Sequence, residues 1–216
     1  MLPRRSGVAW HRRSAGEQVL AANVDLVLVV AAPGRGLDPW RVERLLAAAW
    51  ESGARPVVLL ARADRCPDEG TDVATELRLL AAVAPGVPVH AVSGWTGEGL
   101  DEVAALLAPG ATTVLLGPPG AGKSTLVNRL AGRDLLATGE VADDGDGRHI
   151  AGPRQLLALA GGALVIDTPG LRELGAAPAE PGAAGARAGL AAAERRRRVR
   201  AVARGLRAGL AEQGRD

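Results

Sequence analysis

The single lysine of this chain stands inside a complete phosphate-binding pattern. Residues 117–124 read G-P-P-G-A-G-K-S and match G-x-x-x-x-G-K-[S/T], in which backbone N–H groups and the lysine surround phosphate oxygens. Lysine and arginine together number 26, and only Lys123 is a lysine. A compact ammonium fits between β- and γ-phosphates where a planar guanidinium is too bulky. The pattern predicts a nucleotide site; the alternative is a glycine-rich turn that carries a lysine by chance.

The residues on either side of this loop predict the strand and the helix that such a site requires. Residues 112–116 are β-branched or aliphatic, and the apolar residues of 124–131 are spaced to form one buried helix face. The loop amides and the helix N-terminus would both face the phosphates. The residues expected to bind the nucleotide here are Gly117, Pro118, Pro119, Gly120, Ala121, Gly122, Lys123, Ser124 and Thr125. Lys123 is also a catalytic candidate, and Ser124 is expected to place its hydroxyl on Mg²⁺.

An acidic residue follows the apolar run 163–166, where the chain reads D-T-P-G. Asp167 would lie at a strand end beside the phosphate loop, where a carboxylate can hold Mg²⁺ through water. Gly170 can offer its N–H to a γ-phosphate. Pro-Gly after a strand is also an ordinary turn. Together with the phosphate loop, D-T-P-G favours a GTPase.

Two segments upstream of the loop resemble guanine-binding elements. Residues 55–64 read R-P-V-V-L-L-A-R-A-D and end like the N/T-K-x-D pattern, with Arg62 and Asp64 as the candidate base contacts. Residues 88–96 read P-V-H-A-V-S-G-W-T, and Ser93 and Gly94 resemble the S-A element beside the base. A strand followed by Asp or Ser is common in α/β proteins. The informative feature is the order, because both segments precede the phosphate loop.

That order resembles the ribosome small subunit-dependent GTPase A family, the circularly permuted GTPases that act in maturation of the 30S subunit. The runs Asn23-Val24-Asp25 and Gly147-Arg148-His149 also fit this family, and the resemblance extends from about residue 16 to residue 174. It implies an α/β fold, namely a P-loop NTPase three-layer sandwich with a mostly parallel sheet and a circularly permuted GTPase domain. It also implies GTP and GDP as ligands, Mg²⁺, slow hydrolysis of GTP, and the 30S subunit or its rRNA as partner. By this resemblance His149, in the first switch of the family, would orient the attacking water, whereas a lone histidine in a loop is otherwise more often solvated polar surface.

Several positions depart from the family pattern. Ala61 and Arg62 replace the usual Asn or Thr and Lys, so guanine preference should be weakened but kept, since Asp64 remains and Arg62 can lie over the base. Ile150, Ala151 and Gly152 stand where the family has its threonines after His149, so the hydroxyl that completes the magnesium shell is missing. This loss leaves two alternatives open: a nucleotide-binding module without hydrolysis, or an RNA-binding protein that acts through its tail.

The modules that flank the GTPase domain in this family are not expected here. About twenty residues precede Asn23, too few for a five-stranded oligonucleotide-binding barrel. The sole cysteine is Cys66 and no histidine follows His149, so no zinc site of the family type is expected. The sequence therefore suggests a short form of the family. Cys66 fits an incidental thiol better than a nucleophile.

Four segments follow from composition and pattern. They are a basic N-terminal segment (1–18), the permuted GTPase domain (19–174), a flexible Ala/Gly/Pro linker (175–189) and an arginine-rich helix (190–216). The arginines of the last segment suit phosphate-backbone binding, and a merely solvated helix is the alternative. No stretch is apolar enough to span a membrane or to serve as a signal peptide, so the sequence predicts a cytoplasmic protein with no membrane partner, and no DNA partner is expected.

The chain of 216 residues, 47% of them hydrophobic, can bury one α/β core. The predicted strands lie at 24–31, 56–61, 87–92, 112–116 and 163–167, and the predicted helices at 39–52, 71–83, 98–107 and 123–131. Residues 154–163 predict a hairpin that adds an antiparallel edge strand. Trp40 and Trp50 are expected in the core, and Trp95 in the loop that borders the base.

Overall fold

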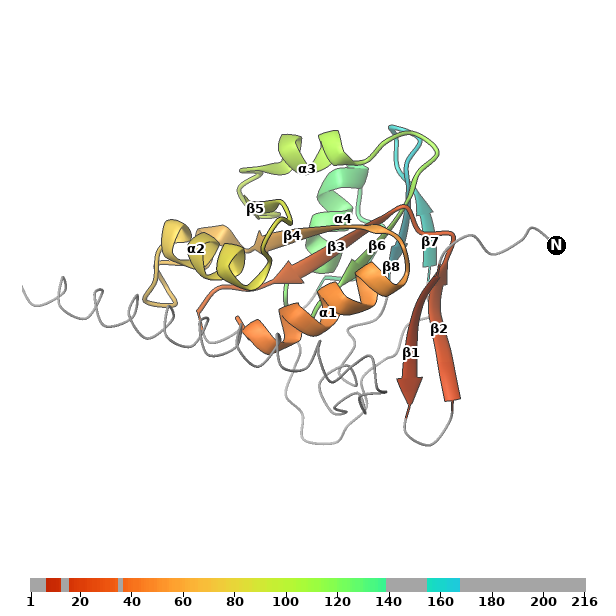
Figure 1. Ribbon diagram of the computed structural model, residues 1–216. Coiled ribbons are helices and arrows are strands. Elements are labelled where there is room, and N and C mark those ends of the chain that lie inside the picture. The colour runs from red at the N-terminus through yellow and green to blue at the C-terminus, as the bar shows by residue number, and fades with distance from the viewer. Residues whose placement is uncertain (1–6, 13–15, 35–36, 139–154, 168–216) are drawn as a thin grey trace, which may run out of the picture.

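The computed structural model describes residues 7–12, 16–34, 37–138 and 155–167 (Figure 1). Within this part of the chain, one sheet of six strands has the order β5-β4-β3-β6-β8-β7. Its strands are β3 (Leu26–Ala31), β4 (Arg55–Ala61), β5 (Val89–Val92), β6 (Thr112–Leu116), β7 (Gln155–Ala158) and β8 (Leu164–Asp167). All neighbours pair in parallel except β7, which runs antiparallel to β8. The predicted strands and the predicted edge hairpin are thus confirmed.

Helices cover both faces of this sheet. They are α1 (Pro39–Glu51), α2 (Val73–Val83), α3 (Leu100–Leu106) and α4 (Lys123–Ala131). Figure 1 shows α1 and α2 on one face and α3 and α4 on the other. The predicted three-layer α/β sandwich with a mostly parallel sheet is therefore confirmed. None of the helices described is long and apolar enough to cross a bilayer.

The central strands explain why two cores form. Every residue of β3 is buried, as expected for a parallel strand covered on both faces. Successive side chains of a strand point to opposite faces. Val27 and Val29 accordingly join the core beneath α1 and α2, whereas Leu28 and Val30 join the core beneath α3 and α4. The apolar strands thus hold the sheet between two helical layers. The polar candidate site residues lie in the loops at the carboxyl edge of the sheet.

The ends of α1 and α2 follow their sequence signals. Asp38 precedes Pro39, and its Oδ1 accepts the N–H of Trp40 at 3.1 Å. Asp72 caps α2 by accepting the N–H of Thr75 at 2.8 Å. Each cap satisfies one N–H group that the helix itself leaves unpaired.

The prediction that Trp40 and Trp50 lie in the core is wrong. Their side chains are 40% and 59% exposed. The buried stripe of α1 consists of smaller residues, namely Val42, Leu45, Leu46, Ala48 and Ala49. The two tryptophans lie in the first and last turns of the helix, off that stripe, so the sheet is packed by aliphatic side chains instead.

An antiparallel hairpin that the sequence analysis did not predict precedes the sheet. It joins β1 (Gly7–Arg12) to β2 (Gly16–Ala22), with a register irregularity between Val8 and Ala9. Strand β2 crosses residue 19, where the permuted domain was expected to begin. Figure 1 shows the hairpin projecting beyond the sheet, and β1 lies against α1.

The Asn23-Val24-Asp25 run lies just before β3 and connects the starts of three strands. The N–H of Asp25 donates to the carbonyl of Thr112 at 2.8 Å, and its carboxylate accepts the N–H of Thr112 at 2.8 Å. Its own carbonyl accepts the N–H of Arg55 at 3.0 Å. Asp25 therefore aligns β3 with β4 and β6 at the edge opposite the phosphate loop.

Candidate nucleotide-binding site

The loop between β6 and α4 has a backbone that only glycine can follow at key points. A Cβ added to Gly117 would lie 2.4 Å from the carbonyl oxygen of Val30, so a side chain there would collide with β3. Gly120 and Gly122 have φ values of 74° and 93°, a region that other residues rarely adopt. These constraints turn the loop into a cradle ahead of the N-terminus of α4, a geometry that suits anions.

Lys123 is the buried cation of this loop. Its side chain is 7% exposed, and its Nζ donates to the carbonyls of Gly117 at 2.9 Å and Pro118 at 2.8 Å. Burial lowers the pKa of Lys123 from 10.5 to about 8, and the nearby Asp167 carboxylate opposes that shift. A buried ammonium held by neutral carbonyls is stabilised further by an anion. The lysine and the loop together fit a polyphosphate.

Asp167 lies at the carboxyl end of β8, beside the strand that leads into the loop. Ile166 pairs with Val114 of β6, so the carboxylate follows directly on the strand next to the phosphate loop. Burial raises the pKa of Asp167, and the charge of Lys123 works in the opposite direction. A carboxylate and the hydroxyl of Ser124 are hard oxygen ligands of the kind that Mg²⁺ prefers. The donor set therefore suits this cation.

The segments after β4 and β5 meet one another at the same edge. The hydroxyl of Ser93 donates to Asp64 Oδ1 at 2.6 Å. Ser93 Oγ in turn accepts the N–H groups of Trp95 at 3.2 Å and Thr96 at 3.0 Å. Ser93 is fully buried. One hydroxyl thus fixes both the acidic side chain that follows β4 and the loop that follows β5.

Arg62 connects this region to the phosphate loop. It adopts a left-handed backbone conformation, with φ of 56°, and its Nη1 donates to the carbonyl of Gly120 at 3.1 Å. Its Cγ would lie 3.2 Å from a Cβ built on Gly122. The arginine that replaces the usual lysine therefore packs along the phosphate loop and bonds to it.

A shallow groove adjoins the loop after β5. It has a volume of about 430 Å³, and its lining includes Gly94, Trp95, Thr125, Asn128, Arg129 and Arg133. The Trp95 side chain is 79% exposed there. Arg129 of α4 donates from Nε to the carbonyl of Gly94 at 2.7 Å and from Nη2 to that of Trp95 at 2.6 Å. The helix that begins at the phosphate loop thus holds the loop beside the acidic residue.

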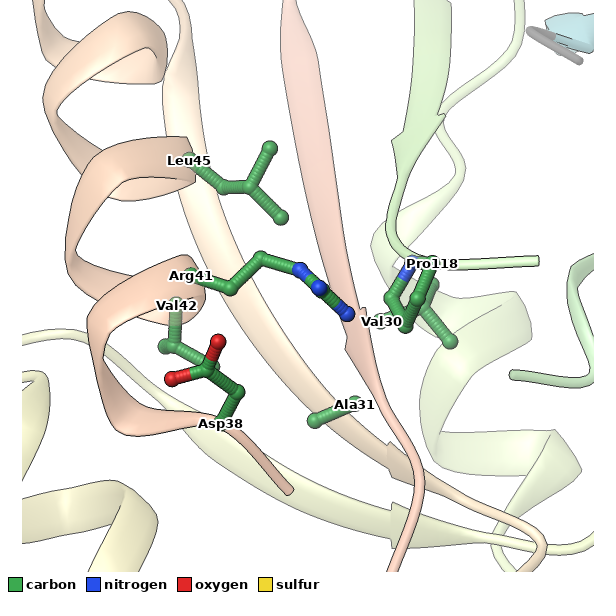
Figure 2. Close-up of a pocket in the computed structure, with 7 residues that line it drawn as sticks. All are labelled: Val30, Ala31, Asp38, Arg41, Val42, Leu45 and Pro118. Carbon is green, nitrogen blue, oxygen red and sulfur yellow. The ribbon is translucent and has the colours of Figure 1, made fainter. Parts of the chain in front are cut away.

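A much smaller cavity lies on the other side of the phosphate loop. Figure 2 shows Arg41 reaching from α1 toward Pro118, with Asp38 nearby. Its volume is about 10 Å³, which leaves room for no more than a water molecule. This cavity separates α1 from the loop and does not extend the groove.

Comparison with known proteins places the chain in a family. Residues 1–177 match the family model described as RsgA GTPase. The chain belongs to the RsgA GTPase family. The resemblance inferred from the motifs is confirmed, and the fold is a circularly permuted P-loop GTPase domain, because β4 and β5 with their guanine-side segments precede β6 and the phosphate loop.

Curated members of the RsgA family share about half of their residues with this chain over the matched region. One, named small ribosomal subunit biogenesis GTPase RsgA, from Streptomyces avermitilis, is 52% identical over 185 residues, covering 84% of this chain and 49% of its own length. Another, named small ribosomal subunit biogenesis GTPase RsgA 2, from Lactiplantibacillus plantarum, is 47% identical over 158 residues, covering 73% and 44%. The chain spans about half the length of these relatives.

A solved structure supports the fold. The crystal structure of YjeQ from Thermotoga maritima aligns with a TM-score of 0.56 and 23% identity, over 80% of this chain and 54% of that one. At this identity the similarity concerns the arrangement of the elements.

The structure of this RsgA-family chain brings most of the predicted site residues to one edge. Those brought together are the phosphate loop from Gly117 to Thr125, together with Arg62, Asp64, Ser93, Gly94 and Asp167. His149 and Gly170 lie outside the described residues, as do Ile150, Ala151 and Gly152 and the arginine-rich tail (190–216). The roles assigned to them remain predictions.

Sequence reasoning missed one residue of the site. Arg129 is exposed on α4, and an arginine at such a position normally indicates only a solvated helix face. Its two carbonyl partners lie far upstream in the chain, so no local pattern marks it.

The surroundings of Cys66 agree with the expectation that it is an incidental thiol and not a nucleophile. It is fully buried, and burial followed by the Glu76 charge raises its pKa to about 11. Because the thiolate is the nucleophilic form of cysteine, this residue is poorly suited to attack a substrate.

Proposed function

We propose that this chain binds GTP and GDP with Mg²⁺, hydrolyses GTP to GDP and phosphate, and acts in biogenesis of the small ribosomal subunit. The main observation in support is that hydrogen bonds join both guanine-side segments to the phosphate loop and to the helix that follows it: Arg62 bonds to Gly120 of the loop, and Arg129 of α4 bonds to Gly94. The names of the curated relatives support the ribosomal role, with the 30S subunit or its rRNA as partner.

Each proposed role follows from the chemistry of one side chain. Lys123 neutralises charge between the β- and γ-phosphates. Asp64 accepts the two hydrogen-bond donors on the guanine edge, while Ser93 keeps that carboxylate in place. Ser124 and Asp167 would hold Mg²⁺, which would supply positive charge to the phosphate oxygens.

Two further roles depend on residues outside the described part of the chain. His149 would orient the attacking water, and the N–H of Gly170 would contact the γ-phosphate. The domain organisation is part of the same proposal, with residues 19–174 as the GTPase domain, a linker at 175–189 and an RNA-facing helix at 190–216. The proposed location is the cytoplasm.

One observation favours a second candidate function. Ile150 and Ala151 stand where the family has threonines after the histidine, so the side chain that normally completes the magnesium shell in the triphosphate state is missing. A chain that binds the nucleotide without hydrolysing it would then act as a nucleotide-dependent docking module, or as an RNA-binding protein through its arginine-rich tail.

The deciding experiment is Mg²⁺-dependent turnover of GTP and ATP by the purified chain, with and without 30S subunits and with Lys123→Ala as the blank. GTP-selective hydrolysis that the subunits accelerate supports the proposal. GTP binding without turnover under either condition supports the docking module instead. Loss of RNA binding on deletion of residues 185–216, with nucleotide binding unchanged, identifies the tail as the RNA contact.

A further inference from the structure

Arg129 makes an interaction that the proposed roles do not use. It lies in the last turn of α4, and its guanidinium bonds two successive carbonyls, those of Gly94 at 2.7 Å and Trp95 at 2.6 Å. Guanidinium carries several donors in one rigid plane, whereas a lysine ammonium is a single point of charge. The contact is therefore specific to arginine in its geometry.

A second contact holds the same loop against the same helix. A Cβ built on Gly94 would lie 3.0 Å from Cγ2 of Thr125 and 3.4 Å from the backbone nitrogen of Leu126. The loop backbone thus touches the first turn of α4, because Gly94 has no side chain. Together with Arg129 from the last turn, this gives two points of attachment along one helix, and they fix how the loop lies on it.

Ser93 connects the loop that Arg129 holds on α4 to the carboxylate of Asp64. Ser93 precedes Gly94, and its hydroxyl donates to Asp64 Oδ1 at 2.6 Å while accepting the N–H of Trp95 at 3.2 Å. A displacement of the loop would move this hydroxyl and release the carboxylate. Asp64 is thus held in position relative to α4, and hence to the phosphate loop at the start of α4, through a continuous chain of contacts.

The geometry assigns Arg129 the role of a positioning residue for guanine recognition. By fixing the loop at 93–95 on α4, it keeps Asp64 at the correct distance and angle from the bound phosphates. This inference rests on the proposed function, since it takes Asp64 as the guanine-binding residue. Arg129 acts through the loop and not through the nucleotide, so its removal weakens binding of the base and leaves phosphate binding intact.

Calorimetric titration of the full chain with Mg·GDP and with Mg·pyrophosphate tests this role, because pyrophosphate lacks the base. For Arg129→Ala we expect about tenfold weaker GDP binding, as for the loss of exposed charge-assisted hydrogen bonds, and pyrophosphate affinity within about twofold. Arg129→Lys keeps the charge but can reach only one carbonyl well, so its GDP affinity should be intermediate. Arg55→Ala is the matched control, since Arg55 is exposed at the opposite edge of the sheet.

Three results would overturn the assignment. GDP affinity that stays unchanged in Arg129→Ala shows that the contact is dispensable. Equal losses for GDP and pyrophosphate show that Arg129 merely supports α4. If the unaltered chain binds pyrophosphate but not GDP, the proposed function fails and this inference fails with it. Should Arg129→Ala not fold, the ratio of the two affinities in Arg129→Lys decides the question in the same way.

Discussion

The phosphate side and the base side of the candidate site lie on the same edge of the sheet, but they differ in how closely they keep to the family pattern. The phosphate loop retains every patterned residue from Gly117 to Ser124. The base side has Ala61 and Arg62 where the pattern has Asn or Thr and Lys, and it keeps Asp64.

The structure gives a physical reason for this difference. The phosphate loop depends on backbone geometry, with positive φ at Gly120 and Gly122 and no space for a side chain at Gly117. Such positions strongly favour glycine. The base side depends on side-chain contacts, and an arginine can bond to the carbonyl of Gly120 from the lysine position. Side-chain contacts can be replaced, whereas the loop backbone cannot.

The largest expected effect is loss of the phosphate-side cation. In Lys123→Ala, affinities for Mg·GDP, Mg·ADP and Mg·pyrophosphate should all fall on the order of a hundredfold, because the cation that pairs with the phosphates is gone. Lys123→Arg should lower the three affinities similarly, since the guanidinium is too large for the buried position. Calorimetry measures all three ligands. Retention of pyrophosphate binding within tenfold in Lys123→Ala would contradict this role.

Removal of the Asp64 carboxylate should weaken binding of the base without weakening binding of the phosphates. In Asp64→Ala we expect about thirtyfold weaker Mg·GDP binding and nearly unchanged Mg·pyrophosphate binding, because only the guanine loses its acceptor. Asp68→Ala is the control, since Asp68 is exposed and pairs with Arg65 at 2.7 Å. Equal losses for both ligands would mean that Asp64 supports the phosphate loop and does not read the base.

The pH dependence of Mg·GDP affinity should come from Lys123 on the phosphate side. Burial lowers the pKa of Lys123 from 10.5 to about 8, so the free chain loses this charge as the pH rises through 8. Bound phosphates favour the charged form and raise its pKa, so Mg·GDP affinity should fall about threefold between pH 7.5 and 8.5. The affinities are measured calorimetrically at the two pH values. An affinity that is flat or rises over this range contradicts the coupling.

The smallest expected effect is a gain on the base side. Ala61 is 3% exposed at the end of β4, next to the phosphate loop. In Ala61→Asn, the added amide can form a hydrogen bond between the segment after β4 and the phosphate loop. We therefore expect Mg·GDP affinity to rise about threefold, with no change in the affinity for Mg·pyrophosphate. Ala47→Asn, an exposed position of α1, is the control. Weaker GDP binding in a folded Ala61→Asn chain would show that the alanine is required by packing.

The sheet and its helices could be predicted because buried runs are long and regular. All residues of β3 and nearly all of β4 are buried, and apolar runs of this kind separated by helical patterns indicate a parallel sheet. The phosphate loop could be predicted because its pattern specifies the backbone. Asp64 and Ser93 were found through their order along the chain, and the structure joins them by a hydrogen bond of 2.6 Å.

The features that escaped prediction depend on packing between distant segments. Trp40 and Trp50 were expected in the core because they lie on the predicted helix 39–52, but the aliphatic stripe of α1 already fills the space over the sheet. The hairpin of β1 and β2 was not predicted, because the segment before residue 19 was interpreted as a basic remnant. Arg129 was not singled out, because its partners become neighbours only when the loop after β5 lies on α4.

The most direct test of the whole account is the affinity of the unaltered chain for Mg·GDP compared with Mg·ADP, measured by calorimetry in one buffer. Both ligands carry the same phosphates, so the ratio reports the base side alone. Since a site built to hydrogen-bond its ligand discriminates strongly against one that lacks the matching groups, we expect GDP to bind at least about tenfold more tightly. Equal affinities would show that the phosphate side acts alone and that Asp64 and Ser93 do not form a guanine site.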